Sequence, residues 1–224
     1  MNRYKWYRLG LPISFQQLLK NIAKNKFVSD ANFGFMTTDA DWGKRNFRFA
    51  WRTHIAKTSF DNAGTPSVEL VASVSYCDFH LFERNELCWL RVVNPPRSLK
   101  ELLNAIEQLS GFGFFSDPVF FPTALPPSLA QNKDAKLIGF KAIGSIPKQH
   151  AVTRVEIASK EGLQIDKLDF LSQMKCVIDH SVYEITFQRI RGQVAFSSTG
   201  VLKISGQLAP LLLSLIEADL ITAK

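Results

Sequence analysis

This sequence lacks long hydrophobic runs and has few cysteines. No uninterrupted apolar window of about 18 residues occurs, so we expect no transmembrane helix and no membrane partner. The basic residues at the N-terminus precede only a short apolar patch broken by Pro12, which is not typical of a secretory signal. The three cysteines, Cys77, Cys88 and Cys176, cannot all pair with one another, and this odd number favours a reducing compartment. The sequence therefore predicts a soluble, cytoplasmic protein.

Complete metal-binding and cofactor-binding motifs are also missing. Cys77-x-x-His80, with Cys88 nearby, is part of a zinc pattern without a fourth ligand. Asp39-x-Asp41 could place two carboxylates at a magnesium ion, but its surroundings are more typical of a polar loop. Neither a phosphate-binding glycine loop nor a nucleophile motif such as GxSxG occurs. We therefore predict no metal site, no cofactor and no catalytic residue.

Acidic residues are scarce in the first quarter of the chain. Residues 1–58 contain eleven basic and three acidic side chains, a local balance of 11 − 3 = +8, whereas the remainder carries 16 − 17 = −1. A one-sided cationic surface attracts polyanions, of which nucleic acid is the most abundant. The pattern predicts a class of partner rather than a reaction.

The first half of the chain is expected to alternate between helices and antiparallel strands. Ser14 and Gln17 have the spacing of a capping box, which predicts a helix that starts there and exposes Lys20 and Lys24 on one side. Residues 44–52 alternate, with Phe47, Phe49 and Trp51 on one face and the basic side chains on the other. A further capping box at residues 98–101 predicts a second helix that ends near Gly111.

A second alternating run covers residues 68–76 and places Val68, Leu70, Ala72, Val74 and Tyr76 on one apolar face. If this register continued, Asp78 and His80 would fall on the same face. A β-bulge after Tyr76 would restore the pattern, and we expect that bulge rather than a buried Asp–His pair.

The second half is expected to be a β-meander that ends in an apolar helix. Residues 136–146 and 151–158 have strand patterns, a short helix is expected near 164–172, and Gly192 is expected to turn the meander. The predicted fold class is α+β, with largely antiparallel sheets, a few packed helices and two subdomains. Residues 1–121 form the basic, aromatic-rich subdomain, residues 122–133 a Pro-rich connector, and residues 134–224 the meander with its C-terminal helix.

The basic side chains near the N-terminus are the best candidates for contacts with phosphates. A second basic spot lies beside Gly192, where a hairpin tip could enter a groove. The predicted nucleic-acid-binding residues are Lys20, Lys24, Lys44, Arg45, Arg48, Arg52, Arg189 and Arg191.

The last helix, near residues 208–221, is apolar over more than one face and must be covered on two sides. It is either a central core helix or an interface with another subunit. The candidate interface residues are Leu212, Leu213, Ile216 and Leu220.

The leading hypothesis is a non-enzymatic nucleic-acid-binding subunit of a larger protein assembly, of the kind that serves prokaryotic antiphage systems. One alternative is a metal-independent ribonuclease that uses His54, which continues the basic strand. The other is a structural scaffold without nucleic-acid contact. The sequence does not distinguish DNA from RNA or single from double strands.

Overall fold

The computed structural model describes residues 1–37, 46–121, 124–131, 134–146, 151–168 and 175–222. Of these described residues, 52% lie in strands of a mostly antiparallel sheet, and they include four α-helices. Two compact units divide the chain: unit 1 comprises residues 1–6 and 118–224, and unit 2 comprises residues 7–117. Strand β1 (Asn2–Gly10) and the short β6 (Phe115–Pro118) contribute residues to both units.

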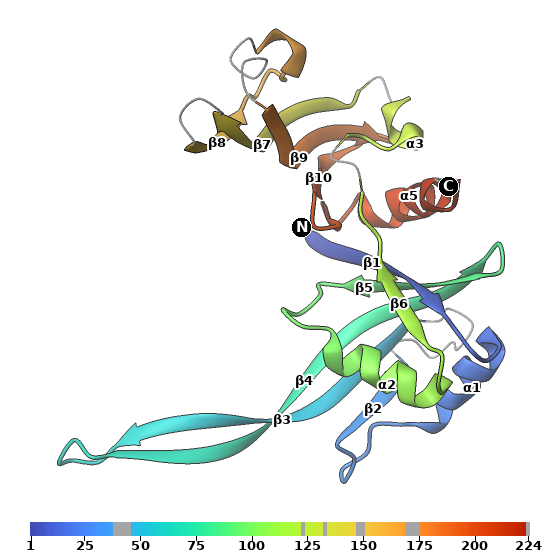
Figure 1. Ribbon diagram of the computed structural model, residues 1–224, viewed down its shortest axis with the longest axis vertical. Helices are drawn as coiled ribbons and strands as arrows, with labels where there is room; N and C mark the ends of the chain where they lie inside the picture. Colours follow the sequence, from blue (N-terminus) through green and yellow to red (C-terminus); the bar gives the residue numbers. More distant parts are fainter. Residues whose placement is uncertain (38–45, 122–123, 132–133, 147–150, 169–174, 223–224) are drawn as a thin grey trace. The chain divides into compact units, whose positions relative to one another are not determined.

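Unit 2 is a sheet with two helices on one face (Figure 1). Its strand order is β2 (Phe33–Thr37), β3 (Asn46–Phe60), β4 (Pro66–Arg84), β5 (Leu87–Val93) and then β1. Helix α1 (Phe15–Lys24) and helix α2 (Lys100–Ser110) cover the apolar face. The aromatic side of β3 is buried there, as the alternation predicts, with Phe47 and Phe49 almost fully covered.

Both helices of unit 2 begin near their predicted starts. Ser14 caps α1, because its Oγ accepts a hydrogen bond from the backbone N–H of Gln17 at 3.2 Å. At α2 the Ser98 Oγ instead accepts from the N–H of Lys100 at 3.3 Å, so the predicted bond to the third following residue is not made. Gly111 ends α2 with a φ of 95°, a conformation that strongly favours glycine.

The hairpin of β3 and β4 is much longer than the sheet that contains it. Its pairing is continuous from Asn46 opposite His80 to Phe60 opposite Pro66. Strand β2 pairs with β3 only through Trp51, and β5 pairs with β4 only from Asp78 onward. Residues 53–73 therefore extend beyond both neighbouring strands as a two-stranded ribbon, here called the arm (Figure 1).

The predicted bulge after Tyr76 is wrong, because β4 keeps its register against β3 throughout. Asp78 and His80 lie on the same side as Tyr76, and that side faces away from the helices. Phe79 and Leu81 are the buried residues. The apolar face of residues 68–76 is thus exposed rather than buried, since the core lies on the side of Phe47, Phe49 and Phe79.

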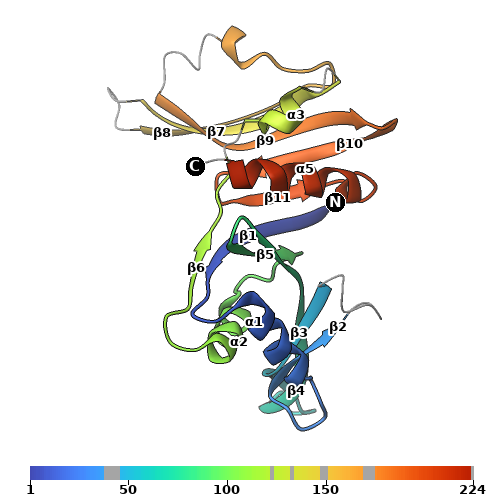
Figure 2. The same cartoon turned by 90° about the vertical axis from the view of Figure 1, so that its right-hand side faces the viewer.

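Unit 1 is a second antiparallel sheet covered on one face by helix. Its strand order is β1, β11 (Val201–Ile204), β10 (Ile190–Ser197), β9 (Lys175–Phe187), β7 (Lys136–Ile146) and β8 (Ala151–Ala158). Figure 2 shows helix α5 (Ala209–Thr222) against this sheet, and α3 (Pro127–Ala130) packs on α5. Within the described residues, no helix has the length and apolar character needed to cross a bilayer.

One local prediction in unit 1 is tested only in part, and another needs correction. The helix expected near 164–172 is described as far as residue 168, where Ile165–Lys167 form a 3-10 turn, and residues 169–172 lie outside the described residues. The β9–β10 turn is made by Gln188 and Arg189, whose φ angles are 48° and 67°, and not by Gly192. Gly192 lies within β10, where a Cβ atom would come within 2.7 Å of the Leu208 side chain, so glycine permits close packing there.

Candidate nucleic-acid interface

Arg48, at the centre of the predicted basic face, is held by an ion pair within unit 2. Its Nε and a terminal nitrogen donate to the two carboxylate oxygens of Asp78 at 2.6 and 2.9 Å. The guanidinium also lies 4.3 Å from the centre of the Tyr76 ring. The hydrogen bond to Asp78 raises the pKa of Arg48. Because Asp78 already neutralises this cation, Arg48 attracts a phosphate less strongly than its position in the sequence suggests.

Arg52 stabilises the loop that precedes β2. Its Nε donates to the carbonyl of Ala31 at 3.0 Å, and a terminal nitrogen donates to the carbonyl of Ser29. The guanidinium also lies 5.7 Å from the Phe27 ring centre. All three of these contacts lie inside unit 2, so the Arg52 guanidinium is less available to a phosphate.

The other predicted residues of unit 2 are dispersed. Lys20 and Lys24 are exposed on α1. Lys44 and Arg45 lie outside the described residues, as do the two aspartates of the possible magnesium loop. His54 is exposed on the arm opposite Ala72. The structure therefore does not bring the N-terminal cations together into one described cluster.

The net charge is distributed between the two units differently from its distribution along the sequence. Unit 1 contains 14 basic and 9 acidic residues, a balance of 14 − 9 = +5. Unit 2 contains 13 and 11, a balance of 13 − 11 = +2, because residues 59–117 bring acids beside the basic first quarter. Asp78 opposite Arg48 is one such acid. Most of the excess positive charge belongs to unit 1.

Basic side chains of unit 1 gather on the sheet face opposite α5. Residues directly opposite one another in antiparallel strands share a face, and the pairing carries this face from Arg3 through Lys203 to the outermost strand. The alternate face holds buried residues such as Phe196 and Leu202. The basic sheet face, as we call it, comprises Arg3, Lys5, Lys136, Lys141, Arg154, Arg191 and Lys203.

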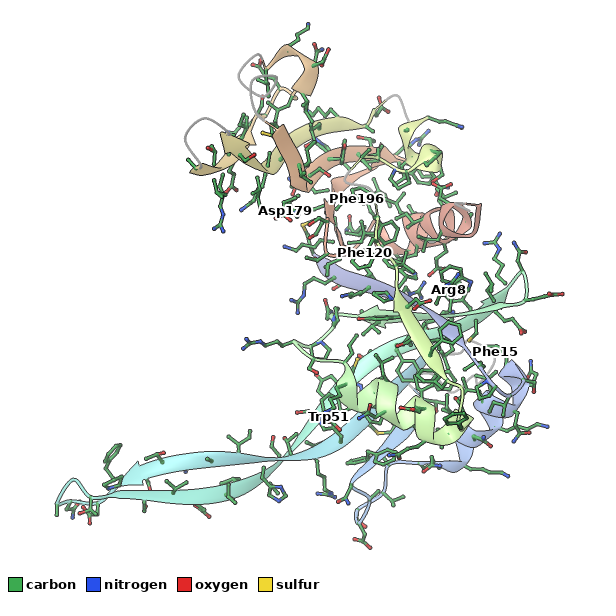
Figure 3. The ribbon with its side chains drawn as sticks, in the orientation of Figure 1. Arg8, Phe15, Trp51, Phe120, Asp179 and Phe196 are labelled. Carbon is green, nitrogen blue, oxygen red and sulfur yellow. The ribbon has the colours of Figure 1, made fainter. Side chains whose placement is uncertain are left out.

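Three carboxylates partly neutralise this face. Glu184 accepts from Lys136 at 3.1 Å and from Arg191 at 2.9 Å, and these bonds lower the pKa of Glu184. Lys141 pairs with Glu156 at 2.9 Å. Asp179 is the third carboxylate and accepts from the Ser198 hydroxyl at 2.5 Å; Figure 3 labels it together with Phe196 of the buried side. Exposed ion pairs contribute little stability, so an incoming phosphate can compete for their cations.

Adjoining hollows form a shallow trough across the basic sheet face. One hollow of about 570 Å³ is lined by residues that include Lys160, Glu184 and Arg191. A middle hollow of about 230 Å³ shares Ile138, Ala158 and Gln193 with the first. A third, of about 480 Å³, shares Lys141 and Glu156 with the middle one and includes Arg154. The trough crosses β10, β9, β7 and β8, and cations occur along its whole length.

The positive charges of this face act on His180, which lines the middle hollow. Burial lowers the pKa of His180, and the charges of Lys203 and Lys141 lower it further, while Asp179 opposes them. A histidine with a lowered pKa is neutral at physiological pH. It is therefore a hydrogen-bonding group in the trough rather than an additional cation.

Of the two predicted spots, only the second contributes to the basic sheet face. Arg191 lies on it, and Arg189 is exposed at the neighbouring turn. The other cations were missed because each strand supplies only one or two of them to this face. Alternation was the available signal: in residues 151–158, Arg154 and Glu156 occupy exposed positions that alternate with half-buried ones.

The candidate interface residues of the last helix fall into two groups. Leu212 and Ile216 are fully buried in unit 1, while Leu213 and Leu220 are half-buried. The α5 helix is anchored through its polar residues as well: the Trp6 indole donates to Glu217 at 3.0 Å, and Asp219 accepts from Ser128 at 2.6 Å. Leu212 and Ile216 thus have a structural role inside the chain, and an interface at Leu213 and Leu220 stays a prediction.

The cysteine and histidine side chains do not form a metal centre within the described residues, where no three potential ligands come together. Burial, with a smaller effect from Asp78, raises the pKa of the Cys77 thiol to about 12. His80 bonds through Nδ1 to the Asn46 side-chain oxygen at 2.9 Å. Cys77 is therefore a neutral core residue at physiological pH.

Comparison with known proteins provides no family. No protein-family model matches the chain, and no curated protein matches it in sequence.

Proposed function

We propose that this protein is a non-enzymatic nucleic-acid-binding subunit and that the basic sheet face of unit 1 contacts the phosphates. The observation that carries the proposal is the gathering of seven basic side chains, against three carboxylates, on one sheet face. A cationic surface gains affinity by releasing the counterions condensed on a phosphate backbone. The N-terminal residues Arg48 and Arg52 contribute less, because both are bonded within unit 2.

The side chains of this face favour contact with the backbone over recognition of bases. Among the described strand residues of the face there is no Phe, Tyr or Trp on which a base could stack. Sequence-tolerant single-strand binding usually depends on such aromatic platforms. The proposed binding is therefore mainly electrostatic, with little sequence preference and a strong dependence on salt.

The experiment compares two pairs of cations. Arg154→Ala with Lys203→Ala removes two charges from the basic sheet face, and Lys20→Ala with Lys24→Ala removes two from α1. Binding to labelled RNA and DNA is measured by fluorescence anisotropy over a series of salt concentrations. The slope of log K against log salt falls by roughly 0.9 per lost phosphate contact on duplex DNA and about 0.7 on single strands.

We expect the first pair to weaken binding and flatten the slope by nearly two such contacts, while the α1 pair changes neither. Equal affinity and slope in the first pair, or a loss confined to the α1 pair, would contradict the proposed surface. A wild-type protein that does not bind either nucleic acid at low salt would reject the function itself and favour a scaffold.

The wider setting of the proposal is a cytoplasmic assembly. The odd number of cysteines supports a reducing compartment, and the half-buried Leu213 and Leu220 on α5 support a protein partner. We also propose that the two units act as separate α+β subdomains, of which unit 1 supplies the nucleic-acid contacts. An assembly of the prokaryotic antiphage kind stays the leading hypothesis for the partner proteins.

A further inference from the structure

The arm of unit 2 has one apolar face. Cross-strand pairs on this face join Ala56 to Leu70, Thr58 to Val68, and Phe60 to Pro66. Phe60, Val68 and Leu70 are 69%, 67% and 68% exposed, respectively. Figure 3 shows the side chains of the arm projecting away from both strands. Large apolar side chains gathered on an exposed surface typically mark an interaction site.

The opposite face of the arm is mostly polar. Thr53 pairs with Ser73, Lys57 with Glu69, and Ser59 with Ser67, whose hydroxyls lie 2.7 Å apart. Only the central pair, Ile55 and Val71, is apolar there. The arm is therefore amphipathic, and its polar face is already suited to water.

The tip of the arm is ordered by its own hydrogen bonds. Asp61 accepts from the backbone N–H groups of Ala63 at 2.9 Å and Thr65 at 2.8 Å, and these bonds lower the pKa of its carboxyl group. A two-stranded hairpin alone is marginally stable in water. A tip ordered by its own hydrogen bonds, on a ribbon with an exposed apolar face, indicates that another surface covers that face.

The charge of the arm favours a second copy of this chain over nucleic acid as the covering surface. The arm contains Lys57, Asp61 and Glu69, a balance of 1 − 2 = −1, so it does not attract nucleic acid. In a two-fold contact between copies the same patch meets itself, and any net charge on it repels its own copy. The whole chain carries +7, yet the pairs of this face from Ala56–Leu70 to Phe60–Pro66 contain no charged side chain, and the next pair inward is His54 with Ala72.

We propose that two copies of this chain associate by packing the apolar faces of their arms against each other. The inference does not depend on nucleic-acid binding. The paired strands give a face about 26 Å long and about 10 Å wide. This is smaller than the roughly 800 Å² that each partner contributes to a standard interface. We therefore expect a weak dimer that depends on protein concentration.

The test is sedimentation velocity of the purified chain over a wide concentration range, with two matched double variants. Val68→Lys with Leu70→Lys places two charges on the apolar face. Ile55→Lys with Val71→Lys places the same two charges on the opposite face. Thermal unfolding of both variants checks that the body of unit 2 is intact. A shortened chain, with residues 54–72 replaced by Asn-Gly, joins Thr53 to Ser73 through a two-residue turn.

We expect the wild type to dimerise with rising concentration, and added salt to leave the dimer intact because the contact is apolar. The Val68/Leu70 variant and the shortened chain should stay monomeric at concentrations where the Ile55/Val71 variant still dimerises. A wild type that is monomeric throughout, or that dimerises only with nucleic acid present, would overturn the proposal. Dimerisation by the shortened chain, or equal loss in both double variants, would do the same.

Discussion

At the scale of single residues, the pair of Arg48 and Asp78 shows how folding redistributes charge. The two are thirty positions apart, and only the register of β3 and β4 places them opposite each other. Both side chains remain about a third exposed, at 38% and 35%, so their contribution to stability is small. Their larger effect is on the electrostatic potential of unit 2, where an acid from outside the basic quarter offsets one of its cations.

His180 gives a residue-scale prediction with a definite sign. Because its pKa is lowered in the folded state, the unfolded chain binds the proton first as the pH falls. The stability that depends on neutral His180 is therefore complete above the unfolded pKa of about 6.5 and is lost as the pH drops from there toward the folded pKa. NMR titration of the imidazole should show the lowered value.

Lys203→Ala should raise the pKa of His180 toward its ordinary value, because it removes one of the charges that lower it. Lys24→Ala, on α1 of unit 2, serves as the control and should leave the titration unchanged. An unaltered titration in Lys203→Ala would show that the charge of Lys203 does not contribute to the shift.

At the scale of elements, structure that depends on neighbouring residues could be predicted from the sequence, whereas structure that depends on distant segments could not. The Ser14 cap, the aromatic side of β3 and the strands near 136–146 and 151–158 follow from neighbouring residues alone. The exposed arm does not. Alternation in residues 68–76 identifies an apolar face, but which face is covered depends on α1 and α2, and on neighbouring strands that end before the arm.

The same limit applies to the candidate interface. A basic strand such as residues 44–52 can be recognised from a short window, whereas the basic sheet face takes its seven cations from five strands, at most two from each. The pairing that joins Arg3 to Lys203 spans most of the sequence. Without knowledge of the strand order, such cations look like isolated surface charges.

Helix α5 gives an element-scale prediction. Ile216 is fully buried and Leu213 only half-buried, although they lie three residues apart. Ile216→Ala should lower the free energy of unfolding by about 2–5 kcal/mol, because it leaves a cavity in the core of unit 1. Leu213→Ala should cost clearly less, and chemical denaturation measures both. Equal losses would mean that α5 does not pack as described.

At the scale of the whole molecule, we expect binding without cleavage. The histidine of the alternative ribonuclease, His54, lies on the arm opposite Ala72, and among the described residues it has no hydrogen-bonded acid or base. A general acid and a general base are both needed for metal-independent hydrolysis. Incubation of labelled RNA and DNA with the protein, with and without magnesium, should leave them intact.

Metal-independent cleavage that disappears in His54→Ala would establish the ribonuclease instead. Cleavage that requires magnesium and disappears in Asp39→Asn or Asp41→Asn would assign a catalytic role to the segment before β3.

The division of β1 between the units has a consequence for synthesis on the ribosome. Residues 7–117 are continuous in sequence, so unit 2 has its whole sheet available as soon as they have emerged. Unit 1 is different, because Asn2 at its start pairs with Ile204 near its end. Contacts of such sequence separation form late and slow folding. Residues 2–5 of the nascent chain therefore wait, unpaired in this sheet, until residues 201–204 have been translated.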